Sequence, residues 1–106
     1  MNLITREELK EKLDRGDGFK LVMALSEWAY RAKRIPGSLH FGSLQEASAV
    51  LNRDDEIVVY CSAPDCVSSI AAYMQMERAG FRNIRRYAGG LTEWESAGLP
   101  LEGEMA

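Results

Sequence analysis

Short apolar runs alternate along the chain with stretches of helical periodicity. The runs that are rich in β-branched or other apolar residues predict strands, at residues 20–25, near 39–41, at 57–60 and at 83–87. The amphipathic stretches between them are bounded by capping residues, Gly or Pro and predict helices, at residues 5–16, 27–33, 44–52, 68–80 and 91–97. Strands that alternate with helices form parallel sheets with helices on both faces. We therefore expect an α/β fold.

Local signals mark the ends of two of the predicted helices. Thr5 and Glu8 have the spacing of a capping box, and Gly16 follows the same helix. Ser68 or Ser69 can cap the helix that stops at Gly80. The segment between residues 60 and 68 is therefore predicted to join a buried strand to the start of a helix.

Cys61 lies where this buried strand is predicted to end. The first N–H groups of a helix have no partner within the helix and lie at the positive end of its dipole, so they favour an anion. Such surroundings lower the pKa of a thiol from about 8.5 by one to several units. Cys61 is thus a candidate nucleophile. The alternative is that it is a small buried apolar residue, as free cysteines often are.

The composition fits one domain over residues 1–106, with a loose tail expected at 102–106. Of the 106 residues, 46% are hydrophobic, which is enough for a modest core. The formal net charge is −3 and charges of both signs are mixed, so neither nucleic acid nor an anionic membrane is expected as a partner. We interpret Arg82, Arg85 and Arg86 as a solvated strand edge rather than a phosphate site.

Location and metal binding follow from equally simple features. No apolar run approaches the roughly 20 residues that span a bilayer, and residues 1–13 are too polar for a secretory signal, so we expect a cytoplasmic protein. In a reducing compartment, two cysteines are expected to be catalytic or redox-active rather than a structural crosslink. The single histidine, His40, belongs to no cluster with metal-ligand spacing, so no metal site is expected and His40 is interpreted as a packed strand residue.

Four features of the sequence, in this order and spacing, resemble single-domain rhodanese-like proteins: Ile35–Ser38 after a strand, the apolar strand that runs into Cys61, Ala79–Phe81 after a helix, and Tyr87–Trp94 before Ala97–Pro100. The resemblance covers nearly the whole chain. It implies a three-layer α/β/α fold with a five-stranded parallel sheet. It also implies a sulfurtransferase or sulfur carrier, in which Cys61 accepts a sulfane sulfur as a persulfide and passes it to a thiol or protein acceptor, with no cofactor.

The active loop of the family corresponds here to Cys61–Cys66, and the substrate-binding positions are Ser62, Ala63, Pro64, Asp65, Cys66 and Val67. The backbone N–H groups from Ser62 to Val67 would surround the persulfide or an anionic donor and stabilise its charge. Pro64 has no N–H, so it would only stiffen the turn.

The chain departs from the common family pattern at several positions. Met23, Leu25 and Arg34 stand where many members have Asp, Arg and His, so the usual polar network must be rebuilt or absent. The loop contains Asp65 and no basic residue, and we therefore do not expect efficient use of thiosulfate. A related phosphatase would need Arg at the position of Val67.

Two roles remain open for Cys66, and with them two functions for the domain. Cys66 is either a resolving thiol that forms a disulfide with Cys61 or an inert packed residue. The alternative to a sulfurtransferase is a non-catalytic binding or redox-sensing module that uses Cys61 and Cys66 as a thiol–disulfide switch. The sequence does not give the oligomeric state, the physiological donor or the acceptor.

Overall fold

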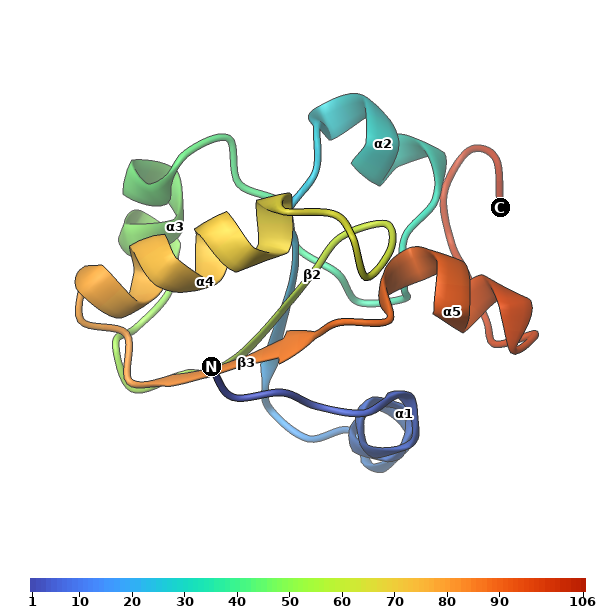
Figure 1. The fold of residues 1–106 in the computed structure, drawn as a ribbon, viewed down its shortest axis with the longest axis horizontal. Helices are drawn as coiled ribbons and strands as arrows, with labels where there is room; N and C mark the ends of the chain where they lie inside the picture. The colour runs from blue at the N-terminus through green and yellow to red at the C-terminus, as the bar shows by residue number, and fades with distance from the viewer.

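Three parallel strands form the centre of the structure, a computed structural model that describes all 106 residues (Figure 1). The strands β1 (Lys20–Met23), β2 (Glu56–Tyr60) and β3 (Asn83–Tyr87) lie side by side in the order β1-β2-β3. The helices are α1 (Arg6–Arg15), α2 (Glu27–Ala32), α3 (Leu44–Val50), α4 (Ser68–Arg78) and α5 (Gly90–Ser96). None of them is long and apolar enough to span a bilayer. The predicted α/β fold is confirmed.

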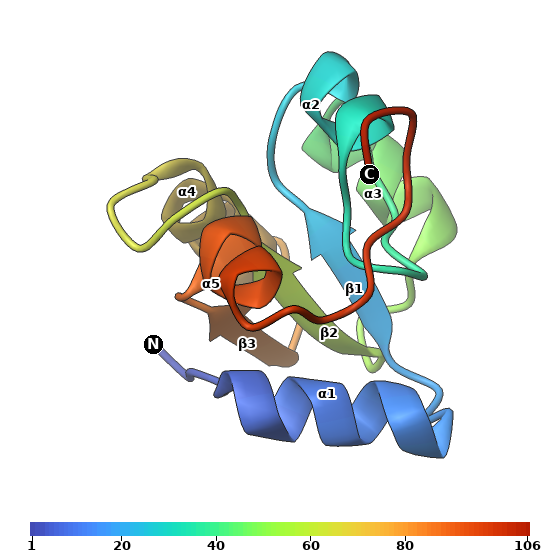
Figure 2. The same cartoon turned by 90° about the vertical axis from the view of Figure 1, so that its right-hand side faces the viewer.

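Each face of the sheet carries its own hydrophobic core, because successive side chains of a strand point to opposite faces. One core joins Val58 and Tyr60 of β2 to Leu9 of α1 and Trp94 of α5. The other joins Ile57 and Val59 of the same strand to side chains of α3 and α4. In Figure 2, α1 lies below the strands and α3 and α4 lie above them, while the contacts of Trp94 place α5 on the same face as α1. The chain thus forms three layers, helices on both faces of a buried sheet.

The sheet has three strands, so the expected number of five is wrong. The two outer positions are each reduced to a single parallel bridge, Leu39 beside Val22 of β1 and Leu3 beside Arg86 of β3. At the first of these, the Met23 N–H donates to the Leu39 carbonyl at 2.9 Å and the Leu39 N–H donates to the Leu21 carbonyl at 2.7 Å. The expected strand at 39–41 is confined to this bridge, because the chain turns at Pro36–Gly37 and bends again before α3.

The predicted N-cap is confirmed for α1 and is wrong for α4, although α4 ends before Gly80 as expected. Thr5 and Glu8 form both hydrogen bonds of a capping box, and Gly16 ends α1 in the left-handed conformation at φ 71°. At α4 the N-cap is Val67, with no side-chain hydrogen bond, so the predicted serine cap is wrong. The backbone is already helical at Val67, and the Ser69 hydroxyl is bonded elsewhere.

The two tryptophans have different environments. Trp94 is 1% exposed, packs edge-on against Tyr87 and donates its indole N–H to the Pro100 carbonyl at 2.8 Å, as expected of a residue packed on the sheet. Trp28, in contrast, is 75% exposed and does not belong to the core. The segment 102–106, expected as a loose tail, forms main-chain hydrogen bonds with residues 31–34 at the end of α2.

Tyr60 connects the buried end of β2 to the Pro-Gly turn. Its hydroxyl accepts the Ile35 N–H at 3.1 Å and shares a hydrogen bond with the Ser38 hydroxyl at 2.6 Å. Burial raises the pKa of Tyr60 above its ordinary value of 10.0. As the pH rises, Tyr60 ionises first in the unfolded chain, because its pKa is higher in the folded state. The contribution of neutral Tyr60 to the free energy of unfolding is therefore fully present below pH 10 and decreases as the pH rises above that value.

Replacing Tyr60 with Phe is therefore expected to lower the free energy of unfolding at pH 7 by about 1–3 kcal/mol, since two buried partners lose their hydrogen bond. The variant should also lose less of its stability than the parent between pH 9 and 11. Urea unfolding at pH 7, 9 and 11 measures the two effects. Tyr73→Phe is the control, because the Tyr73 hydroxyl accepts only the Asn2 N–H. An equal slope of stability against pH in Tyr60→Phe and the parent would contradict the prediction.

Candidate active site

The loop that contains Cys61 leaves the carboxyl end of β2 and enters α4 (Figure 1). Ligands of open α/β sheets bind at this edge, outside the carboxyl ends of the strands. The first turn of α5 fixes the start of the loop. The Leu91 N–H donates to the Cys61 carbonyl at 2.9 Å, and the Thr92 N–H donates to the Ser62 carbonyl at 2.8 Å. These two carbonyls are therefore held against α5, away from the sulfur side of the loop.

Gly90 allows this close approach between α5 and the loop. Its φ is +68°, and a Cβ atom there would lie 2.6 Å from the Cys61 carbonyl oxygen and 2.8 Å from the Ser62 carbonyl carbon. Only glycine fits both the conformation and the space. The pair Gly89–Gly90 is visible in the sequence, but nothing there shows that the second glycine touches the active loop.

The loop offers a smaller set of backbone donors than the sequence suggested. The N–H groups of Ser62, Ala63, Asp65 and Val67 donate to no acceptor within the chain. The Cys66 N–H donates to the Ala63 carbonyl at 3.0 Å and closes a turn, so it is not available as we expected. Unpaired donors at the start of α4 suit an anion, as the sequence predicted.

The sulfur of Cys61 is buried beneath the loop. Cys61 is 1% exposed, and its Sγ lies 3.4 Å from the Ser69 hydroxyl oxygen and 3.4 Å from the Cys66 carbonyl oxygen. A disulfide joins Cys61 to Cys66, with a Cα–Cα distance of 6.4 Å, within the range that a disulfide needs. The loop therefore brings the two sulfur atoms together. Whether Cys66 acts as a resolving thiol stays a prediction.

The sequence interpretation placed Arg86 wrongly. It is 7% exposed, rather than part of a solvated edge. Its Nε donates to the Ser69 hydroxyl at 2.8 Å and its Nη2 donates to the Pro64 carbonyl at 3.2 Å. The alternation of β3 gives the missed signal: Arg86 shares a face with the core residue Ile84, and that face packs against α4.

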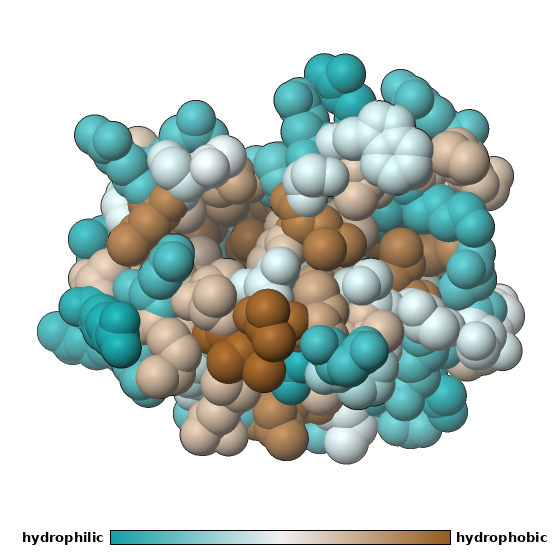
Figure 3. Space-filling view, turned by 45° about the horizontal axis from the view of Figure 1, so that its top comes forward, coloured by the Kyte–Doolittle hydropathy of each residue, from teal (hydrophilic) through white to brown (hydrophobic).

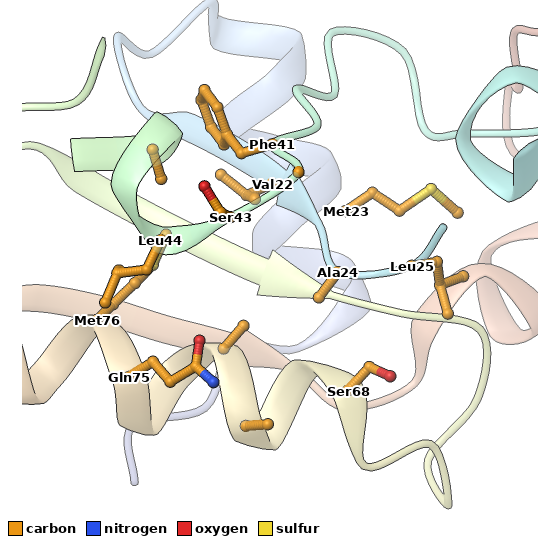
Figure 4. Close-up of a pocket in the computed structure, with 14 residues that line it drawn as sticks. Val22, Met23, Ala24, Leu25, Phe41, Ser43, Leu44, Ser68, Gln75 and Met76 are labelled. Carbon is orange, nitrogen blue, oxygen red and sulfur yellow. The ribbon is translucent and has the colours of Figure 1, made fainter. Parts of the chain in front are cut away.

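The positions that depart from the family pattern have become apolar or have found new partners. Met23 and Leu25 line a pocket of about 310 Å³ between the end of β1, the start of α3 and α4 (Figure 4). Most of its other lining side chains are hydrophobic, among them Phe41, Leu44 and Met76. The pocket extends to Ser68, the first residue of α4 after the loop. An apolar hollow thus lies beside the loop, at positions where the resemblance to the family implied polar residues.

Arg34 and His40 form a separate cluster around Tyr30. Arg34 pairs with Glu102 at 3.1 Å, and its guanidinium lies 4.6 Å from the centre of the Tyr30 ring. The His40 ring stacks on the Tyr30 ring, with 5.3 Å between the ring centres, and the His40 Nε2 lies 2.7 Å from the Leu25 carbonyl oxygen. These contacts hold His40 as a packed residue, and they give Arg34 an ion pair and an aromatic contact.

The surface around the loop is partly apolar. Val67, at the junction of the loop and α4, is 71% exposed. In the space-filling view, apolar side chains reach the surface near the centre of the face, and hydrophilic side chains lie mostly around its edge (Figure 3). Residues 61–67 contain no lysine or arginine. The positive charge at the site therefore comes from Arg86 beneath the loop.

Comparison with known proteins supports this fold, in which a cysteine loop joins a central strand to a helix. Residues 5–97 match the Rhodanese-like domain. The chain therefore belongs to the rhodanese-like domain family. It is 35% identical over 101 residues to the HTH-type transcriptional regulator Rv0324 of Mycobacterium tuberculosis, a match that covers 93% of this chain and 44% of that protein. The chain thus spans less than half the length of this relative.

Solved structures share the fold. The BH2092 protein of Bacillus halodurans superimposes with a TM-score of 0.91 at 20% identity, over 98% of this chain and 78% of that one. The rhodanese-like domain of the Anabaena Alr3790 protein gives a TM-score of 0.87 at 25% identity, over 99% and 81%. A rhodanese-related protein of Thermoplasma volcanium gives 0.80 at 23% identity, over 98% and 100%. The rhodanese-like fold is confirmed.

Proposed function

We propose that the domain is a sulfurtransferase or sulfur carrier in which Cys61 forms a persulfide. The observation that carries the proposal is the buried Cys61 sulfur, held beside the Ser69 hydroxyl at the start of α4 and under a loop with unpaired N–H groups. Membership of the rhodanese-like family supports it. An anionic sulfur is the species that such surroundings stabilise, and a thiolate or persulfide anion is what sulfur transfer requires.

Sulfur is transferred in two nucleophilic displacement steps. The Cys61 thiolate attacks the sulfane sulfur of the donor, a new S–S bond forms, and the donor bond breaks so that its electron pair leaves with sulfite or with a thiolate. The thiolate of the acceptor then attacks the outer sulfur of the Cys61 persulfide, and the Cys61 thiolate leaves. The apolar surface around Val67 suits a thiol on another protein or a small thiol as the acceptor.

The thiosulfate dianion is expected to be a poor donor, because Asp65 adds negative charge to a loop that has no basic residue. A neutral or singly charged persulfide donor should react faster. Ala63→Lys should lower the KM for thiosulfate about two- to five-fold, the effect of one exposed ion pair of up to roughly 1 kcal/mol. Ala63→Met is the matched control, because it adds length without charge. Steady-state sulfur transfer to a thiol acceptor, measured with both donors, tests this prediction.

Two results would oppose that prediction. Efficient turnover of thiosulfate by the parent would show that Arg86 beneath the loop already supplies the charge that the donor needs. An equal fall in KM for Ala63→Lys and Ala63→Met would show that side-chain length, and not charge, changes thiosulfate binding.

A second function, a redox-sensing module, is favoured by the disulfide between Cys61 and Cys66. A Cys66 thiolate that attacks the inner sulfur of a Cys61 persulfide forms this disulfide and releases hydrosulfide, so the two functions share one product. In the cytoplasm, where we propose that the protein acts, glutathione and thioredoxin would reduce such a disulfide. A relative that is a transcriptional regulator supports a sensing role. A protein that forms the disulfide on mild oxidation but accepts no sulfane sulfur would favour the sensor.

A further inference from the structure

We infer that Arg86 is a positioning residue for Cys61, supplying through Ser69 the positive charge that stabilises an anionic sulfur. The inference deepens the proposed function and rests on it. Its basis is a continuous contact: the Arg86 Nε lies 2.8 Å from the Ser69 hydroxyl oxygen, which lies 3.4 Å from the Cys61 Sγ. All three residues are buried.

The charge of Arg86 has no partner of opposite sign. Its guanidinium forms none of the ion pairs of the chain, and its two side-chain hydrogen bonds go to a neutral hydroxyl and a neutral carbonyl. Arginine does not lose its proton in proteins, and a buried charge without a counter-charge is costly. A thiolate or persulfide anion on Cys61 would supply the missing negative charge. The resting site is therefore built to hold an anion.

Ser69 has the geometry to transmit this charge. Its oxygen accepts the Arg86 N–H, which leaves its own O–H to donate to the Cys61 sulfur when that sulfur is a thiolate. A hydroxyl that is polarised by a cation is a stronger donor than a free one. Ser69 is 1% exposed, so water does not compete for either contact. The second Arg86 contact, with the Pro64 carbonyl, holds the loop at the residue that has no N–H of its own.

The other ionisable groups around Cys61 do not cancel this effect. In the loop, Asp65 is exposed and forms no ion pair, and Cys66 lies beside the sulfur. The first two turns of α4 carry no charged residue, and neither does the carboxyl end of β1. On the side of α5, Glu93 accepts a hydrogen bond from the Tyr87 hydroxyl at 2.7 Å. Arg86 is therefore the only cation in contact with the loop from below.

The test is the pH dependence of alkylation of Cys61 by iodoacetamide, in fully reduced protein and followed on the Cys61 peptide by mass spectrometry. Arg86→Met should raise the midpoint by roughly one pH unit, the scale expected when a nearby opposite charge is lost. Arg86→Lys should restore part of the shift, because it keeps the charge. Ser69→Ala should shift the midpoint in the same direction. Arg85→Met is the matched control, since Arg85 is the neighbouring residue on the opposite face, paired with Glu8 at 2.9 Å.

Unchanged midpoints in folded Arg86→Met and Ser69→Ala would overturn the inference. If Arg86→Met does not fold, the alkylation midpoints of Ser69→Ala and Arg86→Lys test the inference instead, because both substitutions are small changes at buried positions. A shift as large in Arg85→Met as in Arg86→Met would also overturn it, because the effect would then be one of overall charge. Persulfide formation by the parent is measured separately, so failure of the proposed function is distinguished from failure of the role of Arg86.

Discussion

Gly90→Ala is expected to lower the free energy of unfolding by about 3 kcal/mol or more and to disrupt the active loop at the same time. The left-handed backbone costs a non-glycine residue about 1–2 kcal/mol. An added Cβ would also lie 2.6 Å from the Cys61 carbonyl oxygen, a backbone atom that cannot move away without shifting the loop. Urea unfolding measures the stability, and alkylation of reduced Cys61 near pH 7 reports on the loop, with slower reaction expected.

Gly98→Ala is the matched control for this variant. Gly98 also has a positive φ, +73°, but nothing lies within 4 Å of its Cβ position. It should therefore lose only the conformational cost of about 1–2 kcal/mol and keep the alkylation rate of the parent. Equal losses of stability in the two variants, with an unchanged alkylation rate in Gly90→Ala, would show that the contact with the loop does not position Cys61.

Cys61→Ser is expected to abolish persulfide formation, with little change in the fold because serine is close to cysteine in size. Cys66→Ser should have a different effect. If Cys66 is a resolving thiol, the variant should accumulate the Cys61 persulfide and lose the disulfide that forms on mild oxidation. If Cys66 only packs, the variant should differ from the parent in melting temperature and little else. Sulfur loading and thermal unfolding of both variants, measured side by side, distinguish these roles.

One outcome of that pair of variants would overturn the assignment of the nucleophile. In this outcome, the Cys66→Ser protein accepts no sulfur and the Cys61→Ser protein still accepts it. Cys66 would then be the residue that attacks the donor, and the buried sulfur beside Ser69 would be the resolving or packed one. Neither the contact with Ser69 nor the charge of Arg86 would then act on the reacting atom.

Local signals predicted most of the fold because they depend on neighbouring residues. Strand β3 has the predicted bounds, and the capping box at Thr5 forms as expected. The number of strands could not be obtained in the same way. It depends on whether short segments such as the one at Leu39 extend into ladders or stop at one bridge, and this is decided by the path of the chain through the Pro-Gly turn.

The position of the candidate site follows from the sequence, but its composition does not. Cys61 is predicted as the nucleophile because a strand end, a loop and a helix start follow one another in the sequence. Arg86 lies 25 residues after Cys61 in the sequence, and only the packing of β3 beneath α4 brings it under the loop. The pattern of alternating faces would have placed Arg86 with Ile84, but its place in a cluster of three arginines favours the interpretation as a solvated edge.

The central claim, that Cys61 carries sulfane sulfur, is tested most directly by the mass of the reduced protein after incubation with a small persulfide donor. We expect a gain of about 32 Da on the peptide that contains Cys61, removed again by a thiol reductant. No such gain is expected in Cys61→Ser. A parent that gains no sulfur and instead loses about 2 Da through a Cys61–Cys66 disulfide would contradict the claim and leave the thiol–disulfide switch as the function of the loop.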